Sequence, residues 1–130
     1  MNLPEYYQDD VLRYFDGKPQ ELGLYEVLFA ALEKAFPDAS VKVQKTQISF
    51  YGKRLFAMAS LPQRRKKDWP KMCLLVTFGL GYRKESPRIA VATEPYPGRW
   101  THHVLVWRED QIDDELMDWL KEAWEFGESK

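Results

Sequence analysis

The stretch Ile48-Ser49-Phe50-Tyr51-Gly52-Lys53-Arg54-Leu55-Phe56-Ala57-Met58-Ala59 decides the fold, because it predicts two antiparallel strands and the turn that joins them. Glycine at the first central position is typical of a two-residue hairpin turn, so we expect Gly52-Lys53 to form the loop. Cross-strand partners in such a hairpin share a face of the sheet. The expected pairs are Phe50 with Leu55, Ser49 with Phe56, and Ile48 with Ala57.

This pairing divides the hairpin into an apolar face and a mixed face. The apolar face, which we expect to line the core, carries Ile48, Phe50, Leu55, Ala57, Ala59 and Leu61. The mixed face predicts a partly exposed apolar patch of Tyr51, Phe56, Met58 and, from a later strand, Trp107. Either the N-terminal arm covers this patch, or a second copy of the chain does so in a homodimer.

The residues before the hairpin continue the strand pattern with a change of phase. Val41 and Val43 share one face of a strand, whereas Ile48 and Phe50 have the opposite parity. The segment Lys45-Thr46-Gln47 must therefore contain a bulge or a tight bend.

Apolar periodicity predicts the remaining elements. We expect long helices from Pro19 to Phe36 and from Asp110 to Phe126, with Gly127 at the end of the second, and either a short helix or an aromatic arm between Glu5 and Phe15. Further strands are expected at Met72–Phe78, which we expect to be covered on both faces, around Ile89 and Val91, and at His102–Trp107. The predicted core residues are Leu28, Leu32, Ile48, Phe50, Leu75, Val91, Val104, Leu116 and Leu120.

These elements indicate an α+β fold for residues 1–130 as one domain. We expect a two-layer sandwich in which an antiparallel sheet of five or six strands carries its helices mainly on one face. Cys73, in an apolar strand, is interpreted as a core residue, and a single cysteine excludes an internal disulfide.

Composition limits the classes of partner. The net charge is −1, so affinity for nucleic acid would have to come from a local patch. No apolar run approaches the ~20 residues of a membrane helix, and the N-terminus lacks the pattern of a signal peptide. We therefore expect a cytoplasmic protein without a membrane partner, and we identify no cofactor or metal site.

Four motifs together resemble an uncharacterised bacterial family of unknown function, some of whose members are labelled "predicted transport protein". The motifs are Lys45-Thr46-Gln47-Ile48-Ser49-Phe50, Ser86-Pro87-Arg88-Ile89, Pro97-Gly98-Arg99-Trp100-Thr101-His102-His103 and Asp113-Asp114-Glu115-Leu116. The resemblance covers nearly the whole chain and implies a shared fold, with no established reaction or catalytic residue. In the order of its elements the chain is also loosely similar to small domains with frataxin-like topology.

The densest group of chemically committed residues is Glu94–His103. Two prolines stiffen this segment, and Pro97-Gly98 predicts a turn with positive φ at the glycine. The turn presents Arg99 and Trp100 ahead of both histidines.

We expect a shallow pocket in which this turn meets the bend at residues 45–47. Its predicted ligand-binding residues are Lys45, Thr46, Ser49, Arg99, Trp100, His102 and His103, with one of the two histidines facing the ligand. Guanidinium and ammonium groups suit carboxylates or phosphates. The leading hypothesis is a small soluble binding module for an anionic small molecule or a phosphate-bearing partner, whose affinity rises as the pH falls through about 6.5. In the competing interpretation Arg99 pairs with Glu94 and only locks the turn.

Two alternative functions remain open. The basic run Arg64, Arg65, Lys66 and Lys67, with Trp69 as a stacking ring, is the basis for the alternative of a nucleic-acid-binding accessory domain. A solvated loop tip would carry the same charges. Ser49 together with a histidine is the basis for a remote hydrolase alternative, although no strand-turn-helix elbow surrounds the serine.

Overall fold

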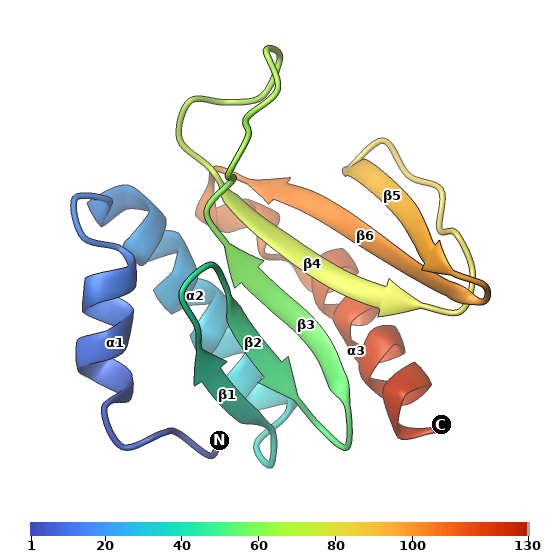
Figure 1. The fold of residues 1–130 in the computed structure, drawn as a ribbon, viewed down its shortest axis with the longest axis horizontal. Helices are drawn as coiled ribbons and strands as arrows, with labels where there is room; N and C mark the ends of the chain where they lie inside the picture. The colour runs from blue at the N-terminus through green and yellow to red at the C-terminus, as the bar shows by residue number, and fades with distance from the viewer. Residues whose placement is uncertain (130) are drawn as a thin grey trace.

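The computed structural model of the chain describes residues 1–129. Its elements, in chain order, are α1 (Tyr7–Tyr14), α2 (Pro19–Ala35), β1 (Ser40–Val43), β2 (Ile48–Tyr51), β3 (Leu55–Ser60), β4 (Leu74–Leu80), β5 (Ile89–Tyr96), β6 (Arg99–Val106), a short 3-10 helix at Glu109–Gln111, and α3 (Asp114–Glu128). Figure 1 shows α2 and α3 behind one face of the sheet and α1 beside the β1 edge.

The six strands form one antiparallel sheet in the order β1-β2-β3-β4-β6-β5. The predicted α+β fold, with an antiparallel sheet and helices on one face, is confirmed. We call the face against α2 and α3 the helix face and the opposite one the open face. The long connection at residues 61–73, between β3 and β4, rises from the end of the sheet (Figure 1).

The core lies between the sheet and the helices. Seven of the nine predicted core residues are at most 1% exposed: Leu28, Leu32, Ile48, Phe50, Val104, Leu116 and Leu120. The prediction was wrong for Leu75 and Val91, which are only half-buried. The prediction that the strand at residues 72–78 is covered on both faces is wrong, because the helices cover only one face (Figure 1).

Residues 44–47 form a hairpin turn between β1 and β2. Val43 pairs with Ile48, and the Gln44 N–H donates to the Gln47 carbonyl at 2.8 Å. Of the two alternatives for the change of phase, the tight bend is therefore correct and the bulge is not.

The predicted register of the next hairpin is wrong by two residues. Phe50 pairs with Ala57 and Tyr51 with Leu55, so the loop contains residues 52–54. Contacts with α3 explain the difference. A Cβ on Gly52 would stand 2.6 Å from Nε1 of Trp124, and the Lys53 N–H donates to a Glu128 carboxylate oxygen at 2.6 Å.

An irregularity between Phe50 and Tyr51 also moves Phe56 out of the predicted exposed patch. Phe56 is 3% exposed, and its ring centroid lies 4.9 Å from that of Phe36, on the helix face. Tyr51 and Met58 stay half-buried, and Trp107 is 38% exposed. The N-terminal segment pairs with Ser40 at the outer edge of β1, so it does not cross the open face.

The first aromatic segment is a helix, as one of the two alternatives predicted. The Tyr7 and Tyr25 hydroxyl oxygens are 2.7 Å apart in the core between α1 and α2. At the other end of α1, the Tyr14 hydroxyl donates to the Thr46 carbonyl at 3.0 Å and accepts the Leu61 N–H at 3.1 Å. One side chain thus ties α1 to the 44–47 turn and to the end of β3.

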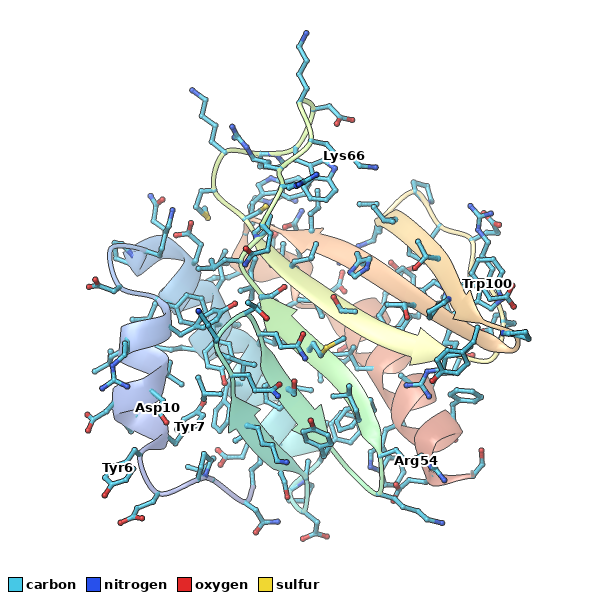
Figure 2. The ribbon with its side chains drawn as sticks, viewed as in Figure 1. Tyr6, Tyr7, Asp10, Arg54, Lys66 and Trp100 are labelled. Carbon is cyan, nitrogen blue, oxygen red and sulfur yellow. The ribbon has the colours of Figure 1, made fainter. Side chains whose placement is uncertain are left out.

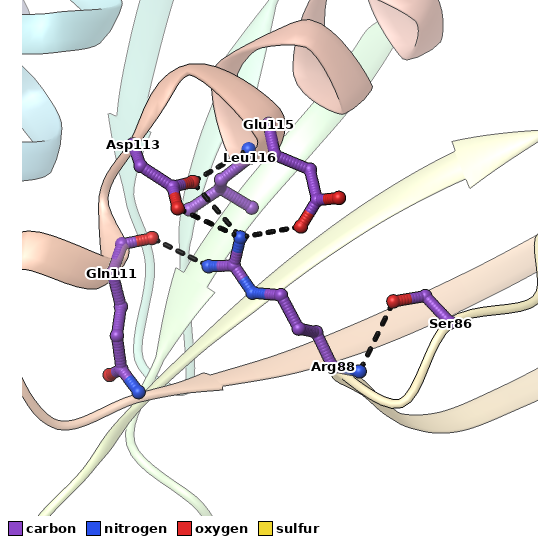
Figure 3. A network of polar contacts seen from close by, with 6 residues as sticks. All are labelled: Ser86, Arg88, Gln111, Asp113, Glu115 and Leu116. Atoms are coloured by element: carbon purple, nitrogen blue, oxygen red, sulfur yellow. Dashed lines mark hydrogen bonds and ion pairs between the residues drawn. The ribbon is translucent and has the colours of Figure 1, made fainter.

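The N-terminus of α3 is held by Arg88, as Figure 3 shows. Its Nη1 donates to both Asp113 carboxylate oxygens (2.9 and 3.1 Å) and to Glu115 (2.8 Å), and its Nη2 donates to the Gln111 carbonyl at 2.7 Å. Asp113 also caps the helix by accepting the Leu116 N–H. Gly127, expected at the end of this helix, lies inside it, one residue before Glu128.

Neighbouring leucines of β4 test the one-sided sheet. We expect Leu74→Ala to lower the free energy of unfolding by about 2–5 kcal/mol, because Leu74 is fully buried on the helix face. Leu75→Ala should cost less, about 1 kcal/mol, because its side chain is only partly buried, on the open face. Urea denaturation measures both values, and equal losses would contradict the assignment of the two faces.

A second pair of variants tests the Arg88 contacts. We expect Arg88→Met to lower the free energy of unfolding by on the order of 1 kcal/mol, a small value because the Asp113 and Glu115 side chains are 44% and 54% exposed. Arg108→Met is the control, since its pair with Asp110 is more exposed and should contribute almost nothing. Thermal unfolding of both variants would refute this role if the two lost the same stability.

Candidate functional site

The predicted site residues come together only in part, at a pocket on the open face below the 61–73 connection. This pocket, called the loop pocket here, has a volume of about 380 Å³. Its walls are Thr46, Gln47, Ser60, Leu61, Pro62, Gln63, Arg64, Trp69, Leu75, Val91 and His103. It thus combines Thr46 and His103 from the predicted anion site with Arg64 and Trp69 from the predicted nucleic-acid loop.

Thr77 of the neighbouring strand β4 holds the His103 ring in place. The Thr77 Oγ1 and the His103 Nδ1 are 2.8 Å apart, and Thr77 is 3% exposed. His103 Nε2 has no partner among the described residues. When the threonine hydroxyl donates to Nδ1, the Nε2 carries the proton and can donate to a ligand oxygen.

The loop pocket is apolar on its floor and positive at its rim. Leu75 of β4 and Val91 of β5, on either side of β6, form the floor, and the exposed Arg64 stands at the rim. Arg64 has no ion-pair partner within residues 1–129, and no described residue that lines the pocket is acidic. Such a pocket favours a ligand that carries negative charge.

The basic run Arg64–Lys67 is exposed on the connection that rises from the sheet. Trp69 folds back and is half-buried, with the Lys66 Nζ 5.9 Å from its ring centroid. Figure 2 shows Lys66 on this connection, far from Trp100 at the β5–β6 end of the sheet.

Lys45 belongs to a second pocket, next to the first. This helix pocket, of about 440 Å³, lies between α1 and the 44–47 turn and is lined by Asp10, Arg13, Tyr14, Val43, Gln44, Lys45, Leu61 and Gln63. Arg13 is paired with Asp10 at 3.1 Å. Lys45 is exposed and has no ion-pair partner in the described chain.

Arg99 and Trp100 do not meet Lys45, so the pocket that was predicted to join them is not formed. Strands β3 and β4 separate β2 from β6, which corresponds to ~14 Å between their backbones. Arg99 also lies four residues beyond His103, toward the end of the sheet opposite Lys45. The reason is topological, since the 44–47 turn and the β5–β6 hairpin lie at opposite ends of the sheet.

The β5–β6 turn itself forms as predicted, with Gly98 at φ +77°. The competing interpretation paired Arg99 with Glu94, but Glu94 accepts the Gly98 N–H instead, at 3.1 Å. The Arg99 guanidinium lies 5.8 Å from the Phe126 ring, and that of Arg83 lies 5.8 Å from the Trp100 ring.

His102 lines neither pocket, because it is fully buried on the helix face. Its ring stacks on Phe78 at 4.9 Å, and its Nε2 accepts the Lys84 N–H at 2.9 Å. Burial lowers its pKa, and the nearby Phe78 carbonyl opposes that change, although Nδ1 makes no hydrogen bond of good geometry. The neutral ring is therefore the stable form at pH 7.

Ser49 is also buried, and its hydroxyl donates to Gln44 at 2.6 Å and accepts from Gln47 at 2.8 Å. Ser49 and His103 lie in the same cross-strand row, but β3 and β4 separate them through Met58 and Thr77. The structure therefore does not bring a serine–histidine pair together. Within residues 1–129 there is also no cluster of three or more metal-ligating side chains.

Comparison with known proteins gives a family that is described as having an unknown function. The model of a family described as "Domain of unknown function (DUF5655)" matches residues 12–127, nearly the whole chain.

The chain belongs to this family.

No curated protein and no solved structure matches it. The label of transport protein and the likeness to frataxin-like domains therefore stay predictions. No helix within residues 1–129 is long and apolar enough to cross a membrane.

Sequence reasoning missed several residues that build the site. Gln63, which lines both pockets, and Tyr14, which ties their walls together, carried no recognisable motif. A hydroxyl-bearing ring in an otherwise apolar helix stripe was the only signal for Tyr14, because such a group needs a partner when it is half-buried.

The two histidines predict how stability depends on pH. Burial lowers the pKa of both His102 and His103 in the folded chain, so the unfolded chain binds protons more readily below about pH 6.5. We expect the free energy of unfolding to fall between pH 7 and pH 5, by at most about 1.4 kcal/mol per pH unit for each histidine.

Two acidic groups, Asp113 and Glu122, lose their contribution at lower pH. The pKa of Asp113 and of Glu122 is lowered in the folded chain, so their contribution is lost only as the pH falls below about 4.5. Urea denaturation at several pH values, with His102→Gln and His103→Gln as variants, measures each share. A pH-independent stability of the unmodified chain from 7 to 5 would rule the effect out.

Proposed function

We propose that the chain is a binding module for a small anionic molecule, of which a phosphate-bearing one fits best, and that the loop pocket is its site. The main support for this proposal is the pocket itself. Arg64 and His103 line it together with apolar floor residues, and none of its described lining residues is a carboxylate. Its volume of about 380 Å³ lies in the range of small-molecule sites. The anion would contact the Arg64 fork and the His103 Nε2.

A second candidate function is nucleic-acid binding through the exposed run Arg64–Lys67. The observation that favours it is the cluster of four exposed cations beside the Trp69 ring. Salt separates the two functions, because several phosphate contacts along a strand give a steep dependence of affinity on salt, whereas a single anion gives a shallow one.

The test is a titration with inorganic phosphate and pyrophosphate, followed by the backbone amide signals of Thr46 and His103 and the indole signal of Trp69 in NMR spectra. We expect saturable shifts in these signals at pH 6 and weaker binding at pH 8. The affinity should rise as the pH falls, with a midpoint below 6.5 in the free protein, because burial lowers the pKa of His103.

Arg64→Ala should weaken anion binding about tenfold, because a charge-assisted hydrogen bond is lost. Lys53→Ala is the matched control, since Lys53 is an exposed cation in the β2–β3 loop and lines neither pocket. Saturable anion binding that Arg64→Ala leaves unchanged would place the site elsewhere, and the absence of any binding at pH 6 would end the proposal.

A further inference from the structure

The loop pocket and the helix pocket adjoin each other, and we call the two together the groove. Leu61 and Gln63 line both of them. The 44–47 turn lies between them, because Lys45 borders the helix pocket and Thr46 borders the loop pocket. The groove therefore runs from α1, past this turn, to His103.

A single hydroxyl, that of Tyr14, fixes the 44–47 turn between the two pockets. Tyr14 donates to the Thr46 carbonyl at 3.0 Å and accepts the Leu61 N–H at 3.1 Å. The backbone of the 44–47 turn and the first residue of the 61–73 connection are thus tied to one side chain of α1. Preorganisation of this kind lowers the entropic cost of binding a ligand that contacts both pockets.

Positive charge occurs at each end of the groove. Arg64 stands in the loop pocket, and Lys45 stands in the helix pocket, where Arg13 adds a second cation that is paired with Asp10. Neither Arg64 nor Lys45 has an ion-pair partner in the described part of the chain. Between them, the Gln63 amide and the Thr46 side chain offer neutral hydrogen-bonding groups.

On the basis of the proposed function, we infer that the ligand is an elongated small molecule with an anionic group at each end and hydroxyl groups between them, such as a bisphosphorylated sugar. One phosphate binds Arg64 and His103 in the loop pocket. The other binds Lys45 in the helix pocket, and the hydroxyl groups contact Gln63. Trp69 provides a flat wall against the apolar face of the sugar ring.

The experiment compares fructose 1,6-bisphosphate with fructose 6-phosphate and inorganic phosphate by isothermal titration calorimetry at pH 6. We expect the bisphosphate to bind at least tenfold more tightly than fructose 6-phosphate or inorganic phosphate, each of which carries one phosphate group. The second phosphate of the bisphosphate binds without a second loss of translational freedom. A bisphosphate that binds no more tightly than fructose 6-phosphate would overturn the inference.

Variants distinguish this inference from the proposed function. Lys45→Ala should reduce the affinity for the bisphosphate to that for the monophosphate and leave the monophosphate unchanged, whereas Arg64→Ala should weaken both. Lys53→Ala should weaken neither. If phosphate binds with the Arg64 dependence but Lys45→Ala has no effect on the bisphosphate, the inference fails and the proposed function stands. If neither phosphate nor the bisphosphate binds, both fail.

Discussion

The packing of α3 against the centre of the sheet is the interaction on which the rest of the structure depends. Trp119 of α3 contacts Phe78 of β4, and Phe78 stacks on His102 of β6. These aromatic contacts bury one face of β4 and β6, which are the strands that carry the site on their other face. Because side chains alternate along a strand, burying His102 on the helix face necessarily presents His103 on the open face.

Helix α3 is anchored at both ends by segments that are distant in sequence. Arg88, just before β5, binds Asp113 and Glu115 at the N-terminus, and the β2–β3 loop meets Trp124 and Glu128 near the C-terminus. The first of these anchors joins the Ser86-Pro87-Arg88-Ile89 motif to the Asp113-Asp114-Glu115-Leu116 motif. Both motifs therefore have a structural role that explains their chemistry without a ligand.

What could be predicted from the sequence was what local periodicity determines. The two long helices, the strands and most of the predicted core residues follow from the spacing of apolar residues alone. The β2–β3 register could not be predicted, because Gly52 and Lys53 are held by α3, more than 70 residues away in sequence. The residues that surround Lys45 in space could not be predicted either. Periodicity places Lys45 and Arg99 in turns, but only the strand order shows that these turns lie at opposite ends of the sheet.

The position of the groove follows from the same one-sided burial. With α2 and α3 on one face, the helices leave the apolar side chains of Leu75 and Val91 on the other face partly exposed. The connection between β3 and β4 is the longest one in the sheet, and it leaves the sheet beside these residues. Its Trp69 covers part of the apolar floor, while its charged residues stay in solvent. A hollow that is apolar below and positive at its rim is therefore the physical consequence of placing a basic loop above the face of the sheet that the helices leave uncovered.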